Sequence, residues 1–65
     1  MIYQVVLLRD GGDVVETLYW NGTLEETRDL ARAAAAKWDA EFFLVFDFDG
    51  SGDVIYSEQR PFGRR

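Results

Sequence analysis

A small α+β domain with the element order ββαββ is the fold class that the sequence predicts. Two stretches rich in β-branched and aromatic residues, 2–20 and 42–56, are each interrupted by a glycine-containing turn, which is typical of β-hairpins. Between them, residues 23–38 repeat their apolar positions at helical spacing. We therefore expect two β-hairpins that form a four-stranded sheet, with one amphipathic helix packed on one face.

The first hairpin is predicted from strands at residues 2–9 and 13–20, joined through Gly11-Gly12 as a two-residue turn. In that register one face carries Tyr3, Val5, Leu7, Glu16, Leu18 and Trp20. The opposite face carries Ile2, Gln4, Val6, Leu8, Val15, Thr17 and Tyr19. Both faces are substantially apolar, whereas a sheet with one side in water normally alternates apolar and polar residues.

A helix is predicted to begin after Asn21-Gly22, with Thr23 and Glu26 forming a capping box. Acidic residues fill its first turn and Lys37 lies in its last turn, as the helix dipole favours. Its apolar stripe consists of Leu24, Thr27, Ala31, Ala34, Ala35 and Trp38. The small alanine side chains would let the helix axis lie close to the sheet.

The segment 41–58 supports two interpretations, and we favour a hairpin. Its even-numbered aromatic and aliphatic residues share one parity of a strand, which we expect to face the helix: Phe42, Leu44, Phe46 and Phe48. A turn at Gly50-Ser51-Gly52 would place Val54 and Tyr56 opposite Phe48 and Phe46, on that same face.

The alternative is that this segment resembles the entering half of a calcium-binding EF-hand. Oxygen-bearing side chains fall at the first, third, fifth and twelfth loop positions, and Gly52 falls at the sixth, where the loop bends. The resemblance implies a calcium site formed by Asp47, Asp49, Ser51, the Asp53 carbonyl and Glu58. Pro61 follows Glu58 by three residues, where the exiting helix of that motif would run, and it favours the hairpin instead.

The element order, together with the opening pattern of Met1, Tyr3 and Leu7 (MxYxxxL), resembles the β-grasp group, which includes the small immunoglobulin-binding bacterial domains. That resemblance implies the strand order 2-1-4-3. Residues 42–46 are apolar on both sides, however, which favours a central place beside the first strand. We expect the order 2-1-3-4, with 2-1-4-3 as the alternative.

Composition excludes several classes of function. The 65 residues predict one α+β domain, residues 1–59, and a basic flexible tail, residues 60–65. Without cysteine or histidine, the usual nucleophiles and general bases of enzymes are missing, so no enzyme is expected. Residues 1–59 carry twelve acids and four bases, a net charge of −8, which repels the phosphates of nucleic acid.

The location that we expect is the cytoplasm, with no membrane association. No apolar run approaches the ~20 residues of a membrane span. The opening MIYQVVLLRD lacks the basic start and small-residue cleavage site of a signal peptide.

One helix covers only one face of the sheet, so the other face is left as an apolar surface. We expect it to display Ile2, Val6, Leu8, Val15, Tyr19, Phe43, Val45 and Ile55. A contiguous apolar patch of this kind commonly marks an association surface. The sequence therefore predicts a non-enzymatic interaction module without a cofactor, whose partner is a protein and in the first place a second copy of itself; the alternative function is calcium binding.

Overall fold

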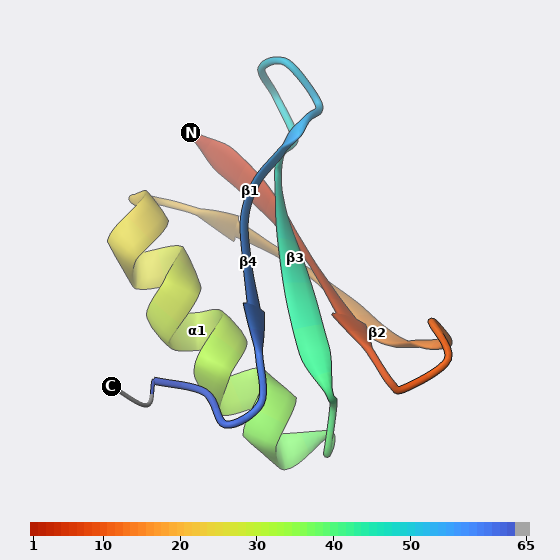
Figure 1. Ribbon diagram of the computed structural model, residues 1–65. Helices are drawn as coiled ribbons and strands as arrows, with labels where there is room; N and C mark the ends of the chain where they lie inside the picture. The colour runs from red at the N-terminus through yellow and green to blue at the C-terminus, as the bar shows by residue number, and fades with distance from the viewer. Residues whose placement is uncertain (64–65) are drawn as a thin grey trace.

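The computed structural model describes residues 1–63 and has the predicted ββαββ order. The strands are β1 (Ile2–Leu8), β2 (Val14–Asn21), β3 (Phe42–Asp47) and β4 (Val54–Gln59), and the helix is α1 (Leu24–Lys37). Figure 1 shows α1 lying diagonally across one face of the sheet, while the other face has no covering element among the described residues. The fold is thus one sheet layer and one helix layer.

The sheet order is β2-β1-β3-β4, with every neighbouring pair antiparallel. The predicted order 2-1-3-4 is confirmed, and the β-grasp order 2-1-4-3 is not adopted. The two central strands are the most apolar segments of the chain, because a central strand has side chains between neighbours on both edges and layers on its faces. The two edge strands, β2 and β4, carry most of the polar residues of the sheet.

The first hairpin keeps the predicted faces from Glu16 onward, although its turn is different and Val15 packs against the core instead of lying on the opposite face. Arg9 and Asp13 close a three-residue turn, with Gly11 and Gly12 both at positive φ, where a predicted two-residue turn would have paired Asp10 with Asp13. A β-bulge at Val15 then adds one residue to β2 and restores the predicted pairing from Leu7 onward. Tyr3, Val5 and Leu7 consequently face the helix.

Helix α1 begins and ends at strong local signals. The Thr23–Glu26 capping box is present at its start. At its end Asp39 adopts positive φ, and Ala40 N–H donates to the carbonyl of Ala35, which is the pattern of a Schellman cap. This tight exit buries Ala40 and starts β3 two residues later, so the cap determines which residues of β3 lie under the helix.

The core lies between α1 and the covered face of β1 and β3. Its buried residues are Tyr3, Val5, Leu7, Ala31, Ala35, Ala40, Phe43 and Val45. Among the described residues, Thr27 is the one polar residue that is buried. Its hydroxyl donates to the Thr23 carbonyl at 2.8 Å. The alanines leave room for the Phe43 ring, which would otherwise be too large for so thin a layer.

The predicted facing of β3 is wrong. Phe43 and Val45 lie under the helix, fully buried, while Phe42, Leu44 and Phe46 lie on the opposite face. The predicted turn of three residues is in fact a longer loop, closed where Asp47 N–H donates to the Asp53 carbonyl, and β4 has a bulge at Ile55. Together these changes pair Tyr56 with Val45 instead of Phe46, so Tyr56 shares the covered face with Val45. The facing of β3 itself follows from its pairing with β1, in which Val45 lies opposite Val5 and Phe43 opposite Leu7.

Residues 60–63 of the predicted tail pack against the domain. Arg60 forms ion pairs with Asp39 and Glu41, and the Phe62 ring lies 5.5 Å from the Phe43 ring, centroid to centroid. Arg64 and Arg65 lie outside the described residues. Within residues 1–63, no helix is both long and apolar enough to span a membrane.

Candidate interaction surface

The face of the sheet turned away from α1, called the open face below, is built from cross-strand rows. Its middle row runs across all four strands as Thr17, Val6, Leu44 and Ser57. The flanking rows are Tyr19, Gln4, Phe46 and Val54 on one side, and Val14, Leu8, Phe42 and Gln59 on the other. Ile2 and Asn21 continue the face at its end. Its centre is therefore apolar and its edges are mostly polar.

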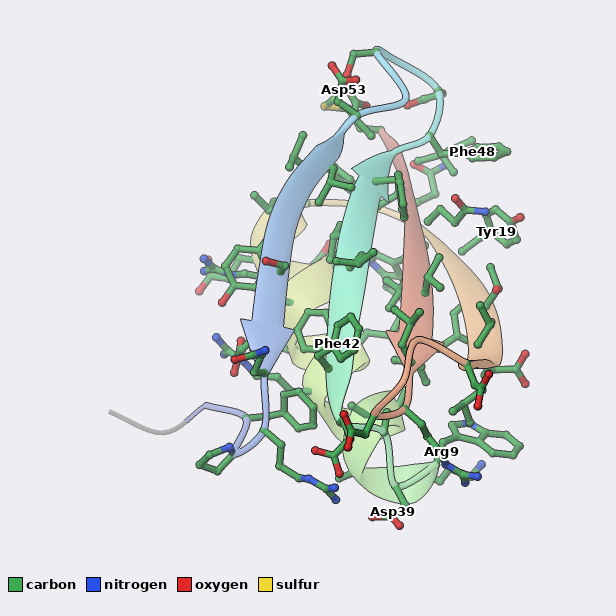
Figure 2. All side chains as sticks on the ribbon, turned by 45° about the vertical axis from the view of Figure 1, so that its right-hand side comes forward. Arg9, Tyr19, Asp39, Phe42, Phe48 and Asp53 are labelled. Carbon is green, nitrogen blue, oxygen red and sulfur yellow. The ribbon has the colours of Figure 1, made fainter. Side chains whose placement is uncertain are left out.

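The apolar strip of the open face is defined by six residues of the two central strands: Ile2, Val6, Leu8, Phe42, Leu44 and Phe46. Leu8 is buried by its neighbours, and the other five are partly exposed. Figure 2 shows Phe42, Tyr19 and Phe48 on this side of the sheet, with the helix behind it. The strip is continuous along β3, whereas Gln4 separates Ile2 from Val6 on β1.

No residue in these rows is charged, although 29% of the chain is. The rows that face the helix differ, since their ends carry Glu16, Asp47 and Glu58. Charged residues are depleted at the centre of protein interfaces and abundant on ordinary solvated surface. The open face has the composition that is typical of the centre of an interface.

One corner of the open face carries a pair of half-exposed aromatic rings. Tyr19 and Phe48 pack edge to face with centroids 5.0 Å apart, and they are 54% and 51% exposed. The Gln4 amide donates to the Tyr19 hydroxyl at 3.0 Å and orients the ring. Phe48 is held by its backbone N–H, which donates to the Ile2 carbonyl. The rings therefore extend the apolar strip beyond the ends of β1 and β3.

The structure places the predicted partner-binding residues in three groups. Ile2, Val6, Leu8 and Tyr19 lie on the open face. Val15 and Ile55 are bulge residues; the first packs against the core and the second is 41% exposed. The prediction that Phe43 and Val45 lie on the open face is wrong, since both are fully buried under α1 for the reason of register given above. Phe42, Leu44, Phe46 and Phe48 take their place.

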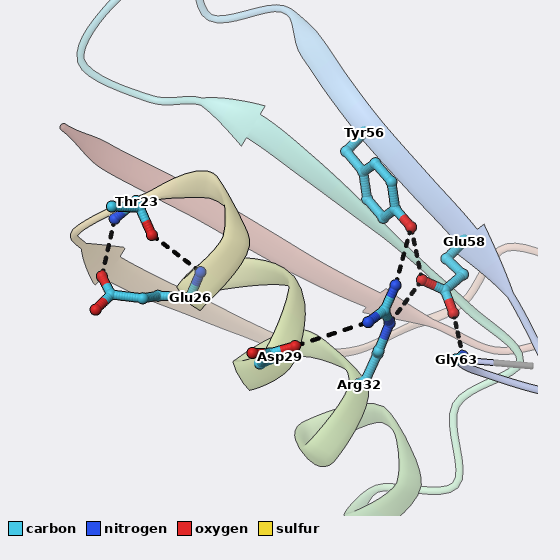
Figure 3. A network of polar contacts seen from close by, with 7 residues as sticks. All are labelled: Thr23, Glu26, Asp29, Arg32, Tyr56, Glu58 and Gly63. Carbon is cyan, nitrogen blue, oxygen red and sulfur yellow. Dashed lines mark hydrogen bonds and ion pairs between the residues drawn. The ribbon is translucent and has the colours of Figure 1, made fainter.

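Polar residues of α1 and of the edge strand β4 form a network on the covered side of the sheet (Figure 3). Arg32 donates to the Glu58 carboxylate at 2.9 Å and to the Tyr56 hydroxyl at 3.3 Å, and that hydroxyl donates to Glu58 at 2.8 Å. Gly63 N–H donates to the second oxygen of Glu58. The Arg28 guanidinium lies over the Tyr56 ring, 5.2 Å from its centroid. Helix, edge strand and C-terminal segment are thus joined by one carboxylate.

This network controls the ionisation of Glu58. Partial burial alone would raise the pKa of the Glu58 carboxyl, but the hydrogen bonds from Gly63, Tyr56 and Arg32 together outweigh burial and lower it. The hydrogen bond to Glu58 likewise raises the pKa of Arg32. Glu58 is therefore a carboxylate at neutral pH, with its oxygens already bound to donors.

The loop predicted as the alternative calcium site is a hydrogen-bonded hairpin loop. The Asp47 carboxylate accepts from Ser51 N–H at 3.2 Å, Asp49 accepts from Ile2 N–H at 3.1 Å, and Ser51 Oγ accepts from Asp53 N–H at 3.2 Å. Glu58, the proposed twelfth-position ligand, is held in the network at the covered side of β4. Within residues 1–63, no cluster of three acidic side chains is arranged to hold a metal ion.

The part of the chain that the structure describes encloses no pocket for a small ligand. Sequence reasoning missed the polar network, although Arg28 and Arg32 are one helical turn apart and Tyr56 and Glu58 share one parity of β4. The open face is thus the candidate surface for recognition that the described residues offer. In comparisons with known proteins, no family model, no curated protein and no solved structure matches this chain.

Proposed function

We propose that this protein is a non-enzymatic interaction module that docks a protein surface through the open face of its sheet. The observation that carries the proposal is the uncharged apolar strip on β1 and β3, which no other element covers among residues 1–63. The largest contiguous apolar patch on a soluble protein is often functional. Cytoplasmic location and the lack of catalytic activity stay predictions from the sequence.

The energetics favour covering this surface. Removing apolar area from water contributes about 25 cal/mol per Å². Four strands about 4.8 Å apart, each about seven residues long at roughly 3.3 Å per residue, make a face of roughly 400–500 Å². The apolar strip lies on the two central strands, about half of that area, so covering it contributes about 5 kcal/mol from this chain before the cost of association is subtracted.

A charge placed in the strip tests the proposal. Leu44→Glu puts a carboxylate into the middle row, whereas Ala33→Glu adds the same charge on the exposed side of α1. Immobilised wild-type protein and both variants are incubated with extract of the native cells. We expect the wild-type and the Ala33→Glu protein to retain the same partner chains and the Leu44→Glu protein to lose them. Equal retention by all three would contradict docking through this face.

A further inference from the structure

We infer that the occupant of the open face is a second copy of this chain, packed face to face with the first about a two-fold axis. This inference rests on the proposed function and names its partner. Three properties of the surface carry it: its arrangement, its extent and its charge.

The arrangement of the open face is self-complementary. The apolar strip lies on the two central strands, and polar residues such as Thr17 and Ser57 flank it on β2 and β4. A two-fold axis between two such faces, running either along or across the strands, brings strip against strip and polar edge against polar edge. A symmetric dimer requires one surface to match itself in this way. Sheets that pack face to face are about 10 Å apart and cross at about −30°.

The extent of the surface favours a copy over a smaller occupant. Specific protein interfaces bury at least about 1,000 Å² in total, or about 500 Å² from each partner. The open face offers roughly that area only when all four strands are covered, as the dimensions above indicate. An extended peptide or a single helix would cover part of it. A second open face covers it completely.

Charge also favours a copy. The chain has a net charge of −5, so two copies repel each other through most of their surfaces. The rows of the open face are uncharged, and Asp13 and Asp49 lie in the loops at its ends. Electrostatic repulsion between two copies is therefore weakest when they approach each other through this face. The absence of acids in the rows also leaves nothing there to pair with a basic partner.

Sedimentation and isotope-filtered NMR test the inference on the full chain. From about 10 µM to about 1 mM, where contacts of this size associate, we expect the wild-type protein to shift from the mass of one chain to that of two. Contacts between labelled and unlabelled copies should involve Val6, Leu44 and Phe46. Added salt should tighten the dimer, because it screens the repulsion between two acidic chains.

The variants give the matched control. Leu44→Glu should raise the dimer dissociation constant by at least about 100-fold, because each copy then buries an unpaired carboxylate. Ala33→Glu should leave it unchanged. Phe48→Asp, at a half-exposed corner position, is the second variant if Leu44→Glu does not fold, and it should weaken the dimer in the same direction.

Each outcome is decisive. A wild-type protein that stays monomeric at about 1 mM overturns the second copy as occupant, while selective partner loss in Leu44→Glu would still support docking. A dimer that survives both Leu44→Glu and Phe48→Asp overturns this face as the contact. A monomer whose retained proteins are the same for wild type and Leu44→Glu overturns the proposed function as well.

Discussion

The two faces of the sheet differ in the charged residues that they carry. The covered face carries Glu16 and Glu58 at its edges, and each of these carboxylates accepts hydrogen bonds from groups nearby. The open face has no charged residue in its rows and only Gln4 and Tyr19 as a hydrogen-bonded side-chain pair. A face with a permanent cover within the chain can pair its charges internally. A face without such a cover is kept neutral.

The comparison shows that a side chain exposed in the single chain can still be of the type found in a core. Phe42 and Phe43 are consecutive, both apolar, and on opposite faces. Only Phe43 has its contacts completed by α1 and Phe62. The open face is built from core-type residues that lack the second layer.

Truncation of the two adjacent phenylalanines should give the largest contrast between the faces. We expect Phe43→Ala to cost about 3–5 kcal/mol of unfolding free energy, because it leaves a cavity under the helix. Phe42→Ala should cost about 1 kcal/mol when the protein is too dilute to associate. Urea denaturation followed by tryptophan fluorescence measures both.

If Phe43→Ala does not fold, Val45→Ala and Val6→Ala make the same comparison with a smaller change. Val45 is fully buried and Val6 is partly exposed. A larger loss for the open-face member of either pair would show that the faces have been assigned the wrong way round.

The network at the edge of the covered face should make stability depend on pH. Because the pKa of Glu58 is lowered by folding, the unfolded chain takes up the proton first as pH falls. The stabilisation is therefore complete above the ordinary glutamate pKa of about 4.3 and is lost as pH falls through the lower folded value. We expect Glu58→Gln to lower the melting temperature by a few degrees at neutral pH and to reduce this acid dependence.

Ala33→Glu is the control for that measurement, since residue 33 is exposed on α1 and lies outside the open face. This substitution adds a carboxyl group that lies outside the network around Glu58. An acid dependence that is the same in wild type and Glu58→Gln would exclude the network as its source.

The loop between β3 and β4 should give the smallest effect. The Asp47 and Asp49 side chains already accept hydrogen bonds from the backbone, and Glu58 is held on the covered side. We expect millimolar calcium to leave the amide resonances of residues 47–58 where an equal ionic strength of sodium chloride leaves them. Saturable movement in calcium alone would show that the loop rearranges to bind the cation, as the EF-hand resemblance implies.

The elements and their order were predictable because their signals are local. The capping box at Thr23 and Glu26, the glycine turns and the helical stripe each act over a few residues. The strand order followed from residues 42–46, which are apolar on both sides and belong at the centre of a sheet.

The facing of β3 was not predictable, because it depends on pairing with β1, which is distant in the sequence. Within residues 42–46 alternation does not distinguish the two faces, so the prediction depended on the parity that these residues share with Phe48. Each hairpin has one bulge on its edge strand. In the first hairpin the Val15 bulge compensates for a turn one residue longer than predicted; in the second the Ile55 bulge leaves the pairing one residue out of step. Bulges have no reliable signature in a single sequence.

The two bulges have a consequence for how assemblies of this protein can grow. Val15 and Ile55 lie on β2 and β4, the only strands of the sheet with an unpaired side, and each interrupts the regular row of backbone donors and acceptors there. Irregular edges discourage the strand-by-strand addition that builds filaments. Under the proposed dimer, contact is made through the open face, and that face is fully covered once two copies have paired, so assembly would stop at two chains.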